Sequence, residues 1–308
     1  MTRRSNSVEA AVGGRRGVVP PSNSGEARGS HPPAPGAGEL DGSERIAAAF
    51  GKARADGRAA LMPYMMGGFP DQGSSLAIAA AYVEAGADLI ELGVPFSDPL
   101  ADGPTIHAAA TEALAGGVTL ESTLGVCASV SERIPVVLMV YSNMVLAHGG
   151  AAEFARRAAA AGAAGAIVPD LPLDEADEIR DALSGAGLAL VPLLAPTTPA
   201  ERRARICAAA QGFVYVVSSV GTTGERRQLP EGLAELVAAT KAEAAVPVAV
   251  GFGIGTPEQV AEVGEIADGV IVGSRLVRAV GESSSPESAA QAVGDFLRDS
   301  LAAQGASR

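Results

Sequence analysis

Three carboxylates gather in one short stretch of the sequence, ELGVPFSDPLADGPTIH at residues 91–107. Glu91 lies inside the apolar run DLIELGV at 88–94, and Asp98 and Asp102 follow in a loop restricted by three prolines, Pro95, Pro99 and Pro104. A carboxylate held among apolar side chains loses hydration, which raises its pKa and suits a group that both donates and accepts a proton. The stretch therefore indicates general acid–base chemistry, with Glu91 as the first candidate.

The loop after Glu91 is stiff and acidic. Proline fixes its backbone at several points, and Gly103 permits a tight turn. Taken alone, Asp98 or Asp102 is as compatible with a turn cap as with a functional role. Taken together, they indicate a loop that holds carboxylates over a site.

Eight short apolar runs alternate with Ala-rich segments of helical spacing, such as 74–87, 151–163 and 256–267. Near-continuous apolar strands separated by helices are typical of a parallel sheet that helices cover. Eight such units in about 260 residues predict a closed (β/α)8 TIM barrel. An open doubly wound sheet is the rival, but no GxGxxG turn follows the first run. The predicted strands are 61–66, 88–94, 136–141, 164–169, 188–194, 212–218, 247–252 and 268–273.

A barrel strand would direct Glu91 inward. Side chains alternate between the two faces of a strand, so Glu91 shares a face with Leu89 and Gly93. The bulkier apolar residues of the run then face the covering helices. Glu91 would lie near the carboxyl end of its strand, where such barrels carry their active sites. The alternative is a solvated or ion-paired glutamate, yet no basic residue is adjacent in the sequence.

Glycine-rich turns follow the last predicted strands. The seventh has Gly251 near its end and is followed by Gly253 and Gly255, and the eighth ends at Gly273 and is followed by Ser274. Loops at these positions commonly bind phosphate through bare backbone N–H groups and a helix N-terminus. The segment SSVGTTGE after the sixth strand adds to the pattern, so we predict a phosphate site. The alternative is that the glycines serve only as tight turns.

Composition limits the remaining classes of function. The chain has 308 residues and a formal net charge of −12, which argues against a nucleic-acid surface. No apolar run reaches the roughly 18 residues of a membrane helix. The two cysteines fit a reducing compartment, so we expect two buried thiols and a cytoplasmic protein. No metal site is predicted.

Two regions differ in composition. Residues 1–42 are rich in Gly, Pro, Ser and Arg, have no strand or helix period, and lack the apolar core of a secretory signal. We expect this N-terminal extension to be disordered and residues 43–308 to form a single catalytic barrel domain. Of the histidines, His107 is expected at the surface in the first turn of a helix.

Together these motifs resemble those of a known family. The stretch ELGVPFSDPLADGPTI resembles the signature of the tryptophan synthase alpha subunit. The resemblance runs from about residue 44 to 305 and includes PYMMGGFPD, VYSNMVLAHG, IVPDLPLDE, YVVSSVGTTGE, GFGIGTPEQV and VIVGSRLV. It implies a (β/α)8 barrel that cleaves indole-3-glycerol phosphate to indole and glyceraldehyde 3-phosphate by a retro-aldol route, without a cofactor.

The resemblance also implies residue roles. Glu91 would be the general acid and base, protonating the indole C3 atom and helping to remove the glycerol hydroxyl proton. Asp102 would accept the indole N–H hydrogen bond, and Tyr215 would border the substrate and support Glu91. The implied phosphate-binding residues are Gly224, Gly251, Gly253, Gly273 and Ser274. The implied indole-pocket residues are Tyr64, Met139 and Ile167. The implied loop and partner residues are Asp98, Asp170 and Thr223.

Two positions depart from the family pattern. Ser219 stands where some members carry an arginine, so one anion-side or loop-closing contact is missing or supplied by Arg226 or Arg227. Tyr64 stands where phenylalanine is frequent, and its hydroxyl needs a partner if it is buried. Neither departure removes a proposed catalytic group.

The family implies a partner. Its alpha subunit binds a beta subunit that carries pyridoxal phosphate, in an alpha2beta2 tetramer, and indole passes between their sites. Asp98 would then report the occupancy of this site to the partner. Three other functions stay open: a non-catalytic activator of a beta subunit, a stand-alone indole-producing lyase, and another phosphate-binding barrel of the same pathway, such as an isomerase or the indole-glycerol phosphate synthase.

Overall fold

The computed structural model describes residues 40–147, 149–217, 230–251 and 253–306. Almost the whole of the predicted N-terminal extension lies outside these ranges. So do Thr223 and Gly224, together with the departure at Ser219 and its candidate substitutes Arg226 and Arg227.

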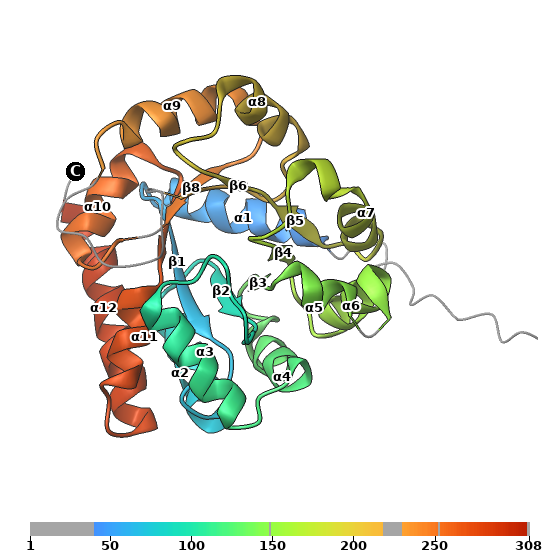
Figure 1. Cartoon of the computed structure of the whole chain (residues 1–308). Coiled ribbons are helices and arrows are strands. Elements are labelled where there is room, and N and C mark those ends of the chain that lie inside the picture. The colour runs from blue at the N-terminus through green and yellow to red at the C-terminus, as the bar shows by residue number, and fades with distance from the viewer. Residues whose placement is uncertain (1–39, 148, 218–229, 252, 307–308) are drawn as a thin grey trace, which may run out of the picture. The chain divides into compact units, whose positions relative to one another are not determined.

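Parallel strands form the centre of the fold, and helices surround them (Figure 1). The strands are hydrogen-bonded in the order β5-β4-β3-β2-β1-β9-β8-β7-β6. Every predicted apolar run contains a strand. The strands are β1 (Ala60–Met66), β2 (Ile90–Gly93), β3 (Val136–Met139), β4 (Gly165–Ile167), β5 (Ala189–Val191), β6 (Leu193–Leu194), β7 (Val214–Val217), β8 (Val248–Gly251) and β9 (Gly269–Val272).

The strands at the two ends of this order, β5 and β6, are consecutive pieces of one predicted strand, and together they close the barrel. β5 pairs with β4 and β6 pairs with β7, and Pro192 alone separates them. Proline has no N–H group to donate to a ladder, so it interrupts the run that the sequence predicts as one strand. Its carbonyl still accepts from the backbone N–H of Tyr215 at 3.0 Å. The prediction of a TIM barrel is confirmed, and the open doubly wound sheet is wrong.

The predicted helical segments are confirmed as α2, α6 and α10. Two of them begin at a side-chain cap: Asp71 accepts from the backbone N–H of Ser74 at 3.0 Å before α2, and Thr256 accepts from that of Gln259 at 3.3 Å before Pro257 opens α10. The described helices are α1 (Gly42–Ala55), α2 (Gln72–Glu84), α3 (Pro104–Ala115), α4 (Leu120–Val130), α5 (Ser142–Leu146), α6 (Gly150–Ala160), α7 (Asp177–Gly185), α8 (Ala200–Ala209), α9 (Leu233–Glu243), α10 (Pro257–Ile266), α11 (Ser274–Gly281) and α12 (Pro286–Ala306), with a 3-10 turn at Leu173–Glu175.

Helix α1 precedes the first strand and was not predicted. Asp41 and Glu44 form a capping box at its start, a signal that the sequence does carry. The backbone N–H of Gly42 donates to Gly187 O at 2.8 Å, and Arg45 donates to carbonyls of the turns before β3 and β4. The helix therefore lies against the amino ends of the strands, opposite the expected active site.

Two carboxylates at the amino ends of the strands, Asp88 and Asp268, each accept hydrogen bonds from a basic side chain and from a backbone N–H group. Asp88, two residues before the start of β2, accepts from the Arg58 guanidinium at 2.9 Å and from the backbone N–H of Leu61 at 2.8 Å. Asp268, directly before β9, accepts from the Lys241 ammonium and the Val248 N–H at 2.9 Å each. These contacts join neighbouring strands where the chain enters the barrel.

Expectations from composition can also be compared with the described residues. Cys127 in α4 and Cys207 in α8 are buried free thiols, as predicted. No single described helix is both long and apolar enough to cross a membrane, although the bent pair α3 and α4 together meets that test of length and composition. The described residues contain no group of three His, Cys, Asp or Glu side chains arranged to hold a metal ion.

Candidate active site

Glu91 occupies the inner face of β2, as its spacing predicts. It pairs in register with Tyr64 on β1 and Val137 on β3, and its side chain is 5% exposed. Its Oε2 atom is buried and has no hydrogen-bond partner among the described residues. A buried carboxylate oxygen without a donor is costly, so this atom is available to a ligand.

A small cavity of about 40 Å³ lies at the carboxyl ends of the strands, above Glu91. The space is large enough for one or a few water molecules, which agrees with a site that must open further to admit substrate. Sequence positions far apart meet there. The predicted residues that line it are Tyr64, Glu91, Asp102, Met139, Tyr215, Gly253, Gly273 and Ser274.

Four predicted residues do not line this cavity. Ile167 is buried deeper and borders a void beneath Glu91. Gly251 instead leaves room for an aromatic ring, because a Cβ there would lie 2.4 Å from the Tyr215 hydroxyl. Asp98 is exposed and bonds the neighbouring Ser97 hydroxyl at 2.5 Å, and Asp170 contacts the start of α5. Of the two loop carboxylates, Asp102 alone faces Glu91.

Burial dominates the electrostatics of Glu91. Removal from water, together with the smaller effect of the negative charge of Asp102, raises the pKa of its carboxyl to about 8. The protonated acid therefore prevails at neutral pH. A carboxylic acid that is neutral near pH 7 can donate a proton to carbon and take one back.

Asp102 occupies a different environment. Partial burial raises the pKa of its carboxyl to about 6, while a hydrogen bond from Tyr141 and the nearby His107 act in the opposite direction. Asp102 is therefore mostly ionised at neutral pH. The two carboxyl groups share one cavity yet differ in charge, which separates an acid from an anion. His107 lies exposed in the first turn of α3, as predicted.

Two tyrosines flank the acid. A Cβ at Gly93 would lie 2.2 Å from the Tyr64 hydroxyl, so Tyr64 extends over a glycine on β2 as Tyr215 does over one on β8. Burial raises the pKa of both phenols, and both therefore remain protonated donors. The hydroxyl of Tyr64 donates to the Met66 sulfur at 3.9 Å. A thioether sulfur is a weak acceptor.

Glycines and a helix start form the opposite wall of the cavity. Gly253 has φ = 82°, a left-handed conformation that favours glycine. Gly273 precedes α11, and no side chain caps the N–H groups of that helix. Backbone N–H groups at a helix N-terminus attract anions. Gly253, Gly273 and Ser274 thus form an anion-compatible edge across from the carboxylates.

Tyr141 is a site residue that the sequence analysis missed. It follows β3, accepts from the backbone N–H of Ala101 at 3.1 Å, and stacks on Phe96 with ring centroids 5.2 Å apart. Its hydroxyl also bonds Asp102. An available signal was its place as the last, polar aromatic residue of a predicted strand, at the end where active sites lie.

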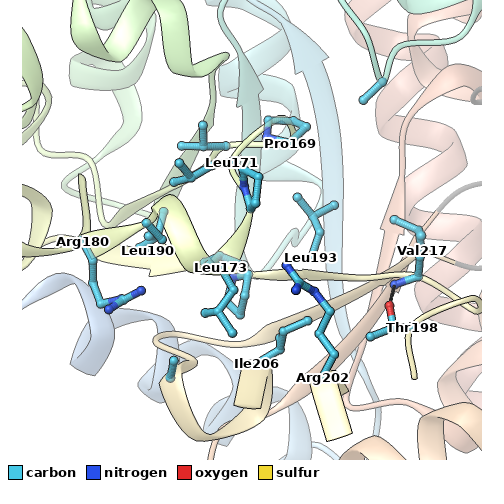
Figure 2. Close-up of a pocket in the computed structure, with 18 of the residues that line it drawn as sticks. Pro169, Leu171, Leu173, Arg180, Leu190, Leu193, Thr198, Arg202, Ile206 and Val217 are labelled. Atoms are coloured by element: carbon cyan, nitrogen blue, oxygen red, sulfur yellow. Dashed lines mark hydrogen bonds between the residues drawn. The ribbon is translucent and has the colours of Figure 1, made fainter. Parts of the chain in front are cut away.

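A second, larger cavity (Figure 2) has a volume of about 520 Å³. It adjoins the acidic loop that follows β2. Its wall is mostly apolar and includes Leu171, Leu173, Leu190 and Leu193, with two arginines, Arg180 and Arg202, also lining it. It shares the acidic loop with the Glu91 cavity, because the two residues before Asp102 line it. An apolar aromatic group therefore has space beside the carboxylates.

Comparisons with known proteins agree on one family. A sequence profile of the tryptophan synthase alpha chain matches residues 50–303. The tryptophan synthase alpha chain of Roseiflexus castenholzii is 49% identical over 257 residues, which cover 82% of this chain and 98% of that one. A crystal structure of Mycobacterium tuberculosis tryptophan synthase is similar with a TM-score of 0.78 at 40% identity, covering 86% of this chain and 98% of that one. The Legionella pneumophila alpha chain gives a TM-score of 0.77 at 35% identity, covering 87% and 98%.

Proposed function

This chain belongs to the tryptophan synthase alpha chain family, and we propose that Glu91 and Asp102 carry out its reaction. The protein is a lyase of tryptophan biosynthesis that cleaves indole-3-glycerol phosphate to indole and glyceraldehyde 3-phosphate. Family membership rules out the alternative of another phosphate-binding barrel from the same pathway.

The first chemical step is protonation of the ring. Glu91, neutral because it is buried, gives its proton to the indole C3 atom. The ring becomes an iminium cation that can accept an electron pair. Asp102, as a carboxylate, accepts a hydrogen bond from the ring N–H and stabilises the positive charge that develops there.

The second step breaks the carbon–carbon bond. Glu91, now a carboxylate, takes the proton of the carbinol hydroxyl next to C3. The electron pair of the bond between C3 and the carbinol carbon returns to the ring, an aldehyde forms, and Glu91 is again a neutral acid. One side chain thus completes the proton cycle, and no co-reactant is needed.

The remaining cavity residues bind and orient the substrate. The phosphate end lies against Gly253, Gly273 and Ser274, where backbone N–H groups at the start of α11 favour an anion. Gly224 is proposed to complete this phosphate site, and Gly251 to support it by leaving space for Tyr215. Binding energy from the phosphate then helps to orient the reacting carbon.

The aromatic end occupies the apolar side of the site. Tyr64 and Met139 border the indole, with Ile167 beneath them, and Tyr215 supports Glu91. The large cavity beside the acidic loop offers space toward which released indole moves on its way to the partner. Thr223 is proposed to lie in a loop that covers bound substrate.

Membership of the family implies a beta-subunit partner. We propose an alpha2beta2 tetramer in which the beta subunit, and not this chain, carries pyridoxal phosphate. Leu100 is 81% exposed on the acidic loop, and Asp98 is exposed beside it. We propose that this loop and Asp170 face the partner, so that Asp98 reports substrate binding to it. The two free thiols support a cytoplasmic location.

The strongest support for the proposal is the environment of the Glu91 carboxyl group. A buried carboxyl oxygen, Glu91 Oε2, has no partner among the described residues and lies in the same cavity as an ionised carboxylate, Asp102. A structural glutamate in this position would be paired.

The test is indole release from indole-3-glycerol phosphate by purified protein, with and without added beta subunit. Slow turnover that rises with the partner and is lost in Glu91→Gln would support the proposal. The Asp102→Asn variant should also lose activity, but it should still bind the phosphate group of the substrate. Protein that is inert with and without partner, yet still activates a beta subunit, would mean a regulatory module. Fast turnover that the partner leaves unchanged would mean a stand-alone lyase.

A further inference from the structure

The carboxyl ends of three consecutive strands are linked by polar contacts. The segment after β2 carries Asp102, the segment after β3 carries Tyr141 and Ser142, and the segment after β4 carries Asp170. We propose that Asp170 and Tyr141 are positioning residues that hold Asp102 in its reactive orientation: Asp170 fixes the backbone at Ser142, and the Tyr141 side chain fixes the acidic loop next to Asp102. The inference rests on the proposed role of Asp102 in the reaction.

The first link joins Asp170 to the start of α5. Its Oδ1 atom accepts from the backbone N–H of Ser142 at 2.8 Å, and its Oδ2 atom accepts from the Ser142 hydroxyl at 2.7 Å. Both oxygens of one carboxylate are therefore used on one residue. Two charge-assisted bonds to the same residue fix the backbone that immediately follows Tyr141.

The second link joins Tyr141 to the acidic loop. Its hydroxyl accepts from the backbone N–H of Ala101 at 3.1 Å and donates to the carboxylate of Asp102. Its ring stacks on Phe96 with an interplanar angle of 28°. A single side chain thus contacts the acidic loop near its beginning and near its end, and Tyr141 itself is 3% exposed.

The loop needs such an anchor. Leu100, two residues before Asp102, is 81% exposed, so the middle of the loop has little packing to hold it. Asp102 is half-buried and would gain hydration by turning outward. The Tyr141 hydroxyl opposes that rotation because it offers the carboxylate a donor on the cavity side.

The same bond favours the ionised form of Asp102. A donor to a carboxylate stabilises its charge, so removal of that donor raises the pKa of the carboxyl further. Other groups act on this carboxyl as well, and a test must leave them in place. The titratable groups that face Asp102 or Tyr141 are Glu91, Tyr64, Tyr215, His107 and Asp170.

The experiment follows the Asp102 carboxyl carbon by ¹³C NMR as a function of pH, with its signal assigned by its loss in Asp102→Asn. Tyr141→Phe keeps the ring on Phe96 and removes only the hydroxyl. We expect the titration midpoint to rise by about one pH unit. Asp170→Asn, which weakens the first link, should move the midpoint in the same direction by less. The acid limb of kcat/KM should move with it.

A matched control separates positioning from stability. Tyr82 is also a buried tyrosine, and its hydroxyl donates to a backbone carbonyl, Tyr64 O, at 3.0 Å. Tyr82→Phe should lower the melting temperature and leave the Asp102 midpoint where it is. If Tyr141→Phe behaves like this control, the hydroxyl is only structural and the inference is wrong.

The titration does not depend on turnover. If the wild-type protein releases no indole but the midpoint moves in Tyr141→Phe, the positioning role stands and the proposed function fails. If indole is released and the midpoint stays fixed in both variants, the function stands and the positioning role is wrong.

Discussion

Asp88 lies just before β2 and Glu91 is the second residue of that strand, and both are buried. Asp88 receives hydrogen bonds from Arg58 and from the backbone N–H of Leu61. Glu91 has a carboxyl oxygen with no partner among the described residues. One short segment therefore contains a carboxylate whose bonds are met by the fold and one whose bonds are left open.

The difference separates stability from function along the barrel axis. At the amino end, carboxylates such as Asp88 and Asp268 join strands to each other and to basic side chains. Further along the barrel axis, burial and the nearby Asp102 charge keep Glu91 neutral, and its Oε2 atom has no donor among the described residues. A buried polar atom without a hydrogen-bond partner destabilises the fold. Such atoms are therefore expected where the substrate supplies the missing hydrogen bond.

The largest expected effect comes from Glu91→Gln. The amide has the same shape but cannot transfer a proton, so kcat should fall by about 10³-fold or more. Its free energy of unfolding should stay within about 1 kcal/mol of the wild type, because no ion pair is broken. The measurements are indole release with beta subunit present and urea unfolding. A loss of stability that matches the loss of activity would remove the contrast with Asp88.

Asp88→Asn should have the opposite effect: it should reduce stability and leave activity nearly unchanged. It leaves the half-buried Arg58 without its main charge partner and the buried site of Asp88 without its charge, and should lower the free energy of unfolding by about 2 kcal/mol. The kcat of the folded fraction should change little. Asp56→Asn is the matched control, since Asp56 is 52% exposed and meets the same guanidinium at 3.5 Å. It should cost no more than about 1 kcal/mol.

The pH dependence sharpens the contrast between the two cavity carboxylates. Below about pH 6 Asp102 is protonated and no longer binds the ring N–H as an anion. Above about pH 8 Glu91 has lost the proton that C3 requires. We therefore expect a bell-shaped kcat/KM profile between these values. Asp102→Asn should remove the acid limb and, because a nearby negative charge is gone, move the basic limb to lower pH. A flat profile would contradict both assignments.

A smaller effect should follow from Gly93→Ala. The new Cβ would lie 2.2 Å from the Tyr64 hydroxyl, so the ring must move within a packed cavity. We expect kcat/KM to fall by about tenfold. Gly125→Ala in α4 is the control, because nothing lies within 4 Å of the added atom. It should leave kcat/KM unchanged and stabilise the helix by up to about 1 kcal/mol.

Much of the barrel follows from the sequence because its signals are local. Apolar runs bounded by helical segments predicted the strands, and alternation along 88–94 predicted that Glu91 faces inward. The break at Pro192 was visible in the sequence but was absorbed into one run. Helix α1 was not predicted although its capping box is a local signal, because the short polar segment around it resembles the low-complexity extension before it.

The geometry of the site was harder to predict. Nothing local separates Asp98, which is exposed, from Asp102, which faces Glu91, because the difference depends on how the loop folds over Tyr141. The roles of Gly93 and Gly251 depend on rings from neighbouring strands, and those contacts are long-range. That Ile167 borders the void beneath Glu91 also depends on packing across the barrel, which no local pattern shows.

The most direct test of the central claim is the protonation of Glu91 itself. Infrared difference spectra between wild type and Glu91→Gln would show the carbonyl band of a protonated carboxylic acid and its loss with rising pH. A midpoint near pH 8 is predicted, because burial without a partner favours the neutral acid. A midpoint near the ordinary glutamate value of about 4.3 would mean that Glu91 is an ionised, paired side chain, and the account of the reaction would fail.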